Sequence, residues 1–282
     1  MPRPAASPRR APKRRQPGHL AFVFRPLRLR WYDGEVAAIE AKDIYKAFGQ
    51  APVLEGVDLS VDAGQRLGLI GPAAAGKTVL LKLLAGLDRP DRGSVAVGDK
   101  DLASLSEAEI MPIRRRIGMA FQSYALFDFM TVGENVAFPL ARAGELDDDT
   151  IRARASERLR QVGLAGSEDK MPSELSGGMK KRVGIARATV TEPEILIYDE
   201  PTAGLDPVTS AKIYELLAGI QAETGGAVIA VSSDVEPLIE FSDTVAMLYD
   251  GRVAYHGAAD EIYDAEQALV RQFVRGDLEG PL

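Results

Sequence analysis

One stretch of this sequence has the residue types and spacing that bind phosphate. Residues 71–78, Gly-Pro-Ala-Ala-Ala-Gly-Lys-Thr, fit the pattern G-x-x-x-x-G-K-[ST]. In such a loop, backbone N–H groups and a helix N-terminus bind anions, the lysine supplies a cation and the hydroxyl ligates Mg²⁺. The pattern therefore predicts a loop that holds nucleotide phosphates. The residues expected to contact them are Gly71, Pro72, Ala73, Ala74, Ala75, Gly76, Lys77, Thr78 and Val79.

The segments around this loop are those that a phosphate-binding loop requires. Arg66–Ile70 is an apolar run typical of a strand, and Lys77–Ala85 has a helical pattern that stops at Gly86. A chance glycine-rich turn is the alternative interpretation. The strand before the loop and the helix after it favour the functional interpretation.

A pair of acids at a second strand end could complete a metal site. Ile195–Tyr198 is a short apolar run, typical of a buried parallel strand, and Asp199 and Glu200 follow it directly. A lone Asp-Glu pair after such a strand means little. Together with the phosphate loop, the pair predicts that Asp199 holds Mg²⁺ and that Glu200 orients or deprotonates an attacking water.

A second glycine-rich turn lies at a predicted helix start. Residues 175–179 are Leu-Ser-Gly-Gly-Met, and Ser176 is a plausible cap for the helix that follows. Backbone N–H groups there would form another anion-binding nest. Since one nucleotide is not easily cradled by both nests of one chain, we expect two chains to meet head to tail. Each would give its Ser176 loop to the nucleotide of the other.

The order of these motifs resembles the ATP-binding cassette (ABC) family. The resemblance covers about residues 38–258 and includes the LSGG signature, Gln122 at the Q-loop position and residues 199–206 from Walker B to the D-loop. It implies an α/β P-loop NTPase with a RecA-like core, an antiparallel β subdomain and an inserted helical subdomain.

The same resemblance implies ATP and Mg²⁺ as cofactors and assigns roles to further residues. Phe48 matches the aromatic residue that stacks on adenine, and core packing is its alternative interpretation. The expected catalytic residues are Glu200, Gln122 and Ser233; the expected metal ligands are Thr78, Gln122 and Asp199; the expected nucleotide contacts outside the loop are Phe48, Ser176, Gly177, Gly178 and Asp206.

Two positions depart from the pattern of the resembled family. Ala74 replaces a usual glycine, which we expect to be harmless if its φ angle stays negative. Ser233 takes the place of the switch histidine and can carry no positive charge. Loss of a well-placed contact to the γ-phosphate would slow hydrolysis by about 10²- to 10³-fold. Glu200 remains, so an active enzyme is still expected.

Alternating strand and helix patterns run from about Val36 and predict an α/β sheet protein. The pattern predicts a half-exposed antiparallel strand, a buried strand, a hairpin with an Asp-Gly turn and an amphipathic helix. These segments are, in that order, Val53–Val61, Ala227–Val231, Thr244–Tyr249 with Arg252–His256, and Asp148–Gly163. The expected organisation is a basic, disordered arm (1–35), a nucleotide-binding domain (36–258) with a helical subdomain at about 123–173, and a C-terminal extension (259–282).

The charge of the chain is unevenly distributed. Residues 1–30 carry nine Arg or Lys and no acid, which leaves 25 basic and 41 acidic residues, a net charge of −16, for residues 31–282. The Pro-rich arm has too few apolar residues to order itself. A solvated tail, attraction to anionic lipid headgroups, binding of nucleic acid and a transit peptide are the open interpretations.

Composition excludes several classes of site. The chain has no cysteine, so disulfides, thiolate nucleophiles and thiolate metal sites are ruled out, as fits a reducing compartment. Its two histidines, His19 and His256, lack metal-ligand spacing. No apolar stretch approaches the roughly 18–20 residues needed to cross a bilayer. An ordinary globular chain is expected, one that does not span a membrane.

A finer resemblance is to the ATPases of Mla- and Mce-type lipid transporters. It rests on residues 121–127, residues 131–140, Met179 of the signature and the tail at 270–281. It implies a homodimer that drives phospholipid transport through separate permease subunits on the cytoplasmic face of the inner membrane, with an Mce-domain lipid-binding protein nearby. In that family such tails contact the neighbouring ATPase subunit.

Two other classes of function stay open at this point. A nucleotide-gated clamp with little turnover would follow from Ser233. A DNA-repair or ribosome-associated ABC protein would make the arm a nucleic-acid tail. Such proteins typically have a coiled-coil insertion, zinc cysteines or two cassettes, and this sequence has none of them. No nucleic-acid partner is therefore expected.

Overall fold

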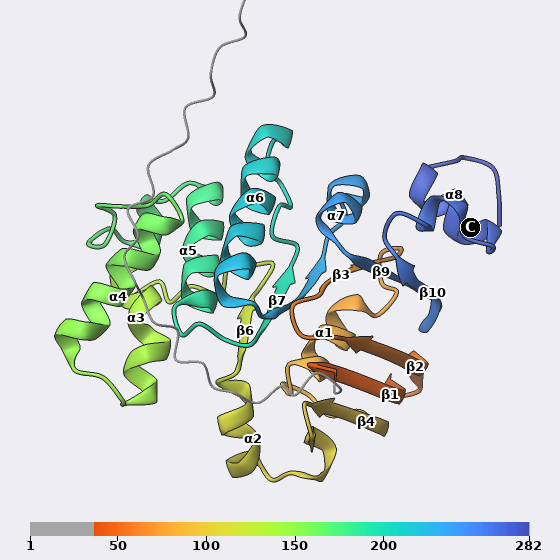
Figure 1. The fold of residues 1–282 in the computed structure, drawn as a ribbon, viewed down its shortest axis with the longest axis horizontal. Coiled ribbons are helices and arrows are strands. Elements are labelled where there is room, and N and C mark those ends of the chain that lie inside the picture. Colours follow the sequence, from red (N-terminus) through yellow and green to blue (C-terminus); the bar gives the residue numbers. More distant parts are fainter. Residues whose placement is uncertain (1–36, 282) are drawn as a thin grey trace, which may run out of the picture. The chain divides into compact units, whose positions relative to one another are not determined.

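Two β-sheets form the framework of residues 37–281, which are the residues that the computed structural model describes (Figure 1). The larger sheet has the strand order β10-β9-β3-β8-β7-β6, and the smaller has the order β2-β1-β4-β5. The strands are β1 (Ile39–Phe48), β2 (Ala51–Val61), β3 (Arg66–Ile70), β4 (Arg92–Val97), β5 (Lys100–Asp101), β6 (Ile117–Ala120), β7 (Ile195–Asp199), β8 (Ala227–Val231), β9 (Thr244–Tyr249) and β10 (Arg252–Ala258).

Helices connect most of these strands. The α-helices are α1 (Lys77–Leu84), α2 (Glu107–Arg114), α3 (Val132–Ala143), α4 (Asp148–Gln161), α5 (Gly177–Thr189), α6 (Pro207–Thr224), α7 (Val235–Phe241) and α8 (Ala268–Arg275). Short 3₁₀ turns are η1 (Leu102–Ser104), η2 (Pro172–Glu174) and η3 (Ile262–Asp264). Within residues 37–281, no helix is long and apolar enough to cross a bilayer. The expectations for the basic arm, residues 1–35, fall outside the described residues.

The larger sheet has a hydrophobic core on each face. Its strands from β6 to β9 pair in parallel, and β10 pairs antiparallel with β9. Along β7, Ile195 and Ile197 face one core, whereas Leu196 and Tyr198 face the other. This alternation is what a strand covered on both faces requires.

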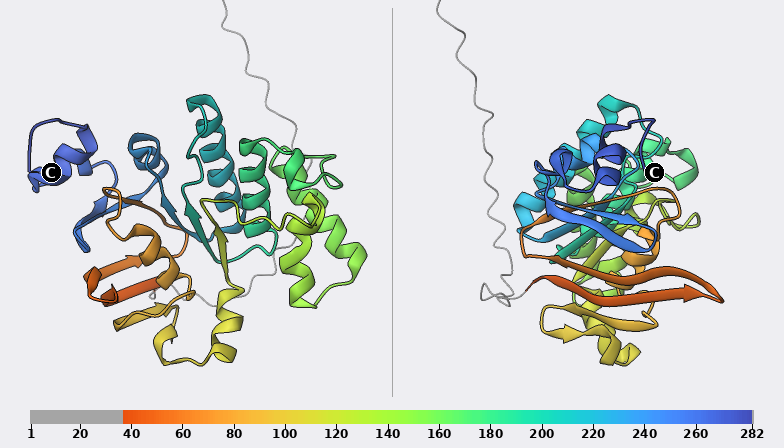
Figure 2. Two further views of the ribbon diagram at one scale, coloured as in Figure 1. Left: turned by 180° about the vertical axis from the view of Figure 1, so that it is seen from behind. Right: turned by 90° about the vertical axis from the view of Figure 1, so that its right-hand side faces the viewer.

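The two cores separate the helices into two groups. Helix α1 and the smaller, antiparallel sheet cover the face that Ile195 and Ile197 share. Helices α3 to α7 contribute to the opposite core (Figures 1 and 2). The helix after the phosphate loop and the helix after the LSGG residues therefore pack on opposite faces of the same sheet.

Most of the predicted segments are confirmed, with small shifts at their ends. The predicted amphipathic helix is α4, and Ile151, Ala155 and Leu159 on its inner face are buried. The predicted hairpin is β9–β10, and both residues of its Asp250-Gly251 turn have positive φ angles, as a type I′ turn requires.

Candidate functional site

The phosphate-loop residues form a tight turn between β3 and α1. Gly71 has a φ angle of 142°, and a Cβ atom there would lie 2.1 Å from the carbonyl oxygen of Leu248. Gly76 has a φ angle of 97° and precedes the first residue of α1. Only glycine fits this backbone path. The turn forms a cradle at the N-terminus of an eight-residue helix, an arrangement that suits an anion.

Lys77 lies folded over this loop. Its ammonium donates hydrogen bonds to the carbonyl oxygens of Gly71 (2.7 Å) and Pro72 (2.8 Å). Burial lowers the pKa of Lys77, while the charges of Glu200 and Asp199 raise it. The cation is thus held where phosphate oxygens would meet the loop. Of the other predicted loop contacts, Ala73, Ala74 and Thr78 are exposed, Gly71, Pro72 and Val79 are half-buried, and Ala75 and Gly76 are buried.

The condition that the φ angle of Ala74 stays negative is not met. Ala74 has a φ angle of 62°, in the left-handed region. An alanine adopts this conformation only against a steric cost of about 1–2 kcal/mol. The substitution of glycine by alanine therefore stores strain in the loop.

Asp199 ends β7 beside the phosphate loop. Its carboxylate is buried, and its Oδ1 atom has no hydrogen-bond partner. Burial raises the pKa of Asp199, the charge of Glu200 adds to this effect, and a hydrogen bond with the Thr78 side chain opposes it. An unpartnered buried carboxylate oxygen next to a hydroxyl is a donor set that suits Mg²⁺. The residues present therefore fit the predicted metal ion.

Glu200 is held in an unusual backbone conformation by bonds to β8 and to the residues that follow it. Its φ angle is 52°. Its N–H donates to the carbonyl oxygen of Val231 at 2.9 Å. Its Oε2 atom accepts hydrogen bonds from both the N–H and the hydroxyl of Ser233, each at 3.0 Å. Ser233 therefore orients the Glu200 carboxylate directly, a contact that sequence reasoning did not predict.

Gln122 lies at the end of the neighbouring strand β6 and is exposed. The loop after it contains two non-glycine residues with positive φ angles, Tyr124 (64°) and Ala125 (48°). Arg187 on α5 donates hydrogen bonds to the carbonyl oxygens of both residues. Strands β6, β7 and β8 thus bring Gln122, Glu200 and Ser233 to one edge of the sheet.

The LSGG residues lie at the start of α5. Ser176 caps this helix by accepting a hydrogen bond of 3.3 Å from the N–H of Met179. Gly177 and Gly178 form its first turn. Asp206 caps α6 in the same way, with both carboxylate oxygens bonded to Thr209. The predicted Ser176 cap is confirmed, and both Ser176 and Asp206 are exposed.

Phe48 is the last residue of β1 and is 55% exposed. Its ring centre lies 5.5 Å from the Lys46 ammonium. The alternative interpretation of Phe48 as a core residue is therefore wrong, and a ring open to solvent remains compatible with stacking on a base.

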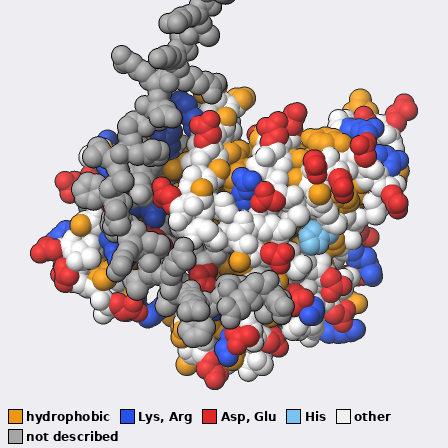
Figure 3. All heavy atoms as spheres, in the orientation of Figure 1, with side chains coloured by type: hydrophobic (Ala, Val, Ile, Leu, Met, Phe, Trp, Pro, Cys, Tyr) orange, Lys and Arg blue, Asp and Glu red, His pale blue; other side chains and the backbone are white. Residues whose placement is uncertain are grey.

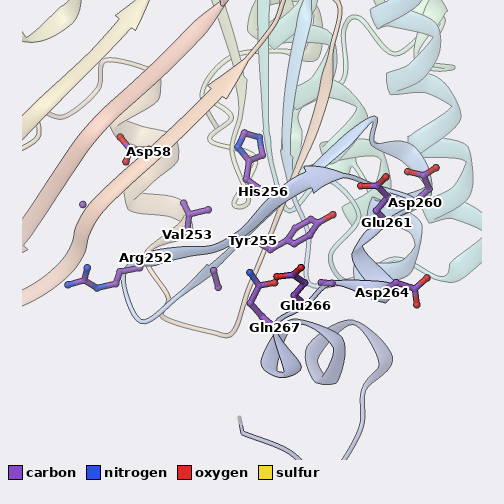
Figure 4. Close-up of a pocket in the computed structure, with 13 residues that line it drawn as sticks. Asp58, Arg252, Val253, Tyr255, His256, Asp260, Glu261, Asp264, Glu266 and Gln267 are labelled. Atoms are coloured by element: carbon purple, nitrogen blue, oxygen red, sulfur yellow. The ribbon is translucent and has the colours of Figure 1, made fainter.

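A separate groove lies elsewhere on the described residues. It has a volume of about 930 Å³ and runs between β10 and the turn around η3. Asp260, Glu261 and Asp264 lie toward one end and Arg252 toward the other (Figure 4). Carboxylates are also spread over the face shown in Figure 3. No residue of the phosphate loop, Walker B strand or LSGG turn lines this groove, and residues 37–281 contain no cluster of three or more Asp, Glu or His residues that could hold a metal ion.

Sequence reasoning missed one residue near Glu200. Lys181, on α5, donates a hydrogen bond of 2.9 Å to the Glu200 carbonyl oxygen, and its ammonium lies 5.5 Å from the centre of the Tyr124 ring. A signal was present, since Lys181 precedes Ile185 by four residues and so shares the buried face of α5.

Comparison with known proteins identifies the family. The profile described as ABC transporter matches residues 54–203, more than half of the chain. This chain belongs to the ABC transporter family. The predicted fold, an α/β P-loop NTPase with ABC ATPase architecture, is confirmed. Membership also implies an ATP-binding subunit of the kind that hydrolyses ATP.

Relatives in the ABC transporter family are named for different functions. Protein TRIGALACTOSYLDIACYLGLYCEROL 3, chloroplastic, from Arabidopsis thaliana is 39% identical over 86% of this chain and 75% of its own length. The methionine import ATP-binding protein MetN of Caulobacter vibrioides is 42% identical over 84% and 72%. The probable ribonucleotide transport ATP-binding protein mkl of Mycobacterium leprae is 39% identical over 87% and 71%.

Solved structures of ABC cassettes share the fold. A dimeric, post-hydrolysis structure of the ATP-binding cassette MJ0796 bound to ADP and Pi is 32% identical, with a TM-score of 0.73, over 78% of this chain and 98% of that chain. The cbiO1 subunit of the cbiONQ complex from Clostridium perfringens is 31% identical, with a TM-score of 0.74, over 86% and 96%.

Proposed function

We propose that this ABC subunit binds and hydrolyses Mg²⁺-ATP as a homodimer and thereby powers lipid movement through separate permease subunits. The observation that carries the catalytic part is the convergence of the phosphate loop, the unpartnered Asp199 carboxylate and the Ser233-bound Glu200 carboxylate. A cation, a metal ligand and a base then lie around one set of phosphates.

Binding would use the contiguous loop. The N–H groups of residues 71–78 and the ammonium of Lys77 would hold the β- and γ-phosphates. The exposed Phe48 ring would stack on adenine. Thr78, Asp199 and Gln122 would hold Mg²⁺, which when bound supplies positive charge that neutralises the phosphate oxygens.

Hydrolysis would use Glu200 as the base. Ser233 donates both of its hydrogen bonds to Oε2. This leaves Oε1 to accept the proton of an attacking water, with the carboxylate already oriented. The proton leaves the water oxygen as that oxygen bonds to the γ-phosphorus and the bond to the leaving ADP breaks.

A second copy would complete the site. Helices α1 and α5 pack on opposite faces of the larger sheet, so Lys77 and Ser176 of one chain begin helices in different layers. Ser176, Gly177, Gly178 and Asp206 would therefore contact the nucleotide of the partner subunit. The dimeric form described for MJ0796 supports this arrangement.

The transport role rests on surfaces beside the site. The region 123–173 contains α3 and α4 and an aromatic cluster in which Phe129 is 77% exposed. Such a patch suits a membrane-embedded partner. We place the subunit on the cytoplasmic face of the inner membrane, with the basic arm near anionic headgroups and the extension at 259–282 against the neighbouring subunit.

A lipid is the proposed cargo. The resemblance of residues 121–140 and Met179 to Mla- and Mce-type ATPases supports it, as does the galactolipid in the name of the Arabidopsis relative. An Mce-domain protein is the proposed carrier. Co-purification with a permease and lipid-stimulated ATPase activity test the transport role, and stimulation by methionine or a ribonucleotide in place of lipid would redirect it to the cargo named for the other relatives.

A nucleotide-gated clamp is the second candidate, favoured by serine at position 233. ATPase assays of wild type, Glu200→Gln and Ser233→His distinguish the two functions. The enzyme predicts a wild-type rate well above that of Glu200→Gln. Wild type and Glu200→Gln that both stay at background, with ATP binding intact, would favour the clamp.

A further inference from the structure

Lys181 is a buried cation that the proposed mechanism does not use. It lies in the first half of α5, and only 7% of its surface is exposed. Lysine is almost never buried to this degree without partners, because removing its charge from water is costly. Its partners are the Glu200 carbonyl oxygen, at 2.9 Å, and the Tyr124 ring, at 5.5 Å from the ring centre.

The Glu200 contact fixes a strained peptide unit. A non-glycine residue with a φ angle of 52° persists only where its surroundings hold it. The N–H of Glu200 is held by Val231 within the sheet, and its side chain is held by Ser233. The carbonyl oxygen is held by Lys181, which comes from the helical layer. This is the bond that ties the Glu200 backbone to α5.

The Tyr124 contact ties the same lysine to the loop that follows Gln122. Six residues farther along α5, Arg187 binds the carbonyl oxygens of Tyr124 and Ala125, so the helix holds this loop at two points. The cavity around Lys181, Tyr124 and Glu200 is only about 10 Å³, room for at most one water. The three residues therefore act on one another at short range, with little solvent between them.

We propose that Lys181 is a positioning residue for hydrolysis, which fixes the Glu200 backbone and links it to the Gln122 loop through Tyr124. The inference rests on the proposed ATPase function and adds a structural link between Glu200 and the Gln122 loop. A movement of the loop that displaces Tyr124 shifts Lys181 and releases the Glu200 carbonyl oxygen. The Glu200 carboxylate is then no longer oriented toward the attacking water, while the phosphate loop is unchanged.

The test compares turnover with binding in the full chain. Lys181→Met keeps the length and apolar stem but removes the ammonium, and we expect kcat to fall on the order of tenfold, with the Kd for Mg²⁺-ATP changed by less than about twofold. Lys181→Gln keeps a hydrogen-bond donor and should recover part of the loss. Lys212→Met, at an exposed position on α6, is the matched control and should equal wild type.

A merely structural role would give a different pattern. Equal losses of ATP binding and turnover with a lowered unfolding temperature, or a wild-type kcat in Lys181→Met, would overturn the inference. If Lys181→Met does not fold, Lys181→Leu, which also lacks a donor to the Glu200 carbonyl oxygen, takes its place, and a wild-type kcat there also overturns the inference. A wild-type chain without turnover overturns the proposed ATPase and this inference together, whereas an active wild type with an equally active variant overturns the inference alone.

A double-mutant cycle tests the link to the loop. Tyr124→Leu removes the ring, and the combination with Lys181→Met should lose less than the product of the two separate effects, because both act through one contact. Fully multiplicative losses would contradict the link.

Discussion

The phosphate loop and the hydrolytic edge of the sheet are built in different ways. The loop consists of eight contiguous residues whose glycines and helix N-terminus form the cradle locally. The hydrolytic edge draws Gln122, Glu200 and Ser233 from the ends of three parallel strands, and tertiary hydrogen bonds hold Glu200 and Ser233. Phosphate binding is therefore encoded in one local segment. Hydrolysis depends on the register of the sheet and on the residues that hydrogen-bond to the catalytic groups.

The largest effect is expected on ATP turnover, with ATP binding left nearly unchanged. Glu200→Gln removes the base but keeps a side chain of the same shape, so kcat should fall by about 10²- to 10³-fold. The Kd for Mg²⁺-ATP should stay within about threefold of wild type, because the phosphate loop is unchanged. Steady-state ATPase assays and calorimetry measure the two quantities. A Kd that rises by as large a factor as kcat falls would show that the two regions are not separable.

The reverse pattern is expected at the loop. Lys77→Ala removes a charged donor to the phosphates, and ATP affinity should fall by about 10- to 100-fold. Calorimetry with Mg²⁺ and ATP gives the affinity directly. Undiminished heat of binding in Lys77→Ala would contradict the assignment of residues 71–78 as the nucleotide site.

A smaller loss is expected at Ser233. Ser233→Ala removes the hydroxyl donor to Glu200 but keeps the backbone N–H, so about a tenfold fall in kcat is expected. Ser60→Ala, at an exposed position on β2, is the control. If Ser233→Ala turns over ATP at the wild-type rate, the serine does not orient the base.

The smallest effect is a gain in stability. Ala74→Gly removes the steric strain of the positive φ angle. It should raise the free energy of unfolding by about 1 kcal/mol, which corresponds to a rise in Tm of about 2–4 °C. Ala73→Gly is the matched control because Ala73 has no positive φ angle, and it should lower Tm slightly. Thermal unfolding without nucleotide measures both; equal shifts in the two variants would exclude strain at Ala74.

The sequence predicts the features that neighbouring residues determine, such as strands, helix caps and tight turns. Hydrophobic alternation, caps at Ser176 and Asp206 and the Asp250-Gly251 turn were readable from neighbouring residues. The bonds of Ser233 and Lys181 to Glu200 were not, because 33 and 19 residues separate the partners and only the sheet brings them together. The sign of the φ angle at Ala74 also depends on the closing geometry of the whole loop.

A mixing experiment tests most directly whether two copies share each nucleotide. Lys77→Ala and Ser176→Arg chains should each be nearly inactive as ATPases. When they exchange subunits, half of the dimers contain one site with both residues intact, so activity should recover to about a quarter of wild type. Activity in the mixture no greater than the mean of the separate variants would contradict the shared site, because Lys77 and Ser176 would then act within one chain.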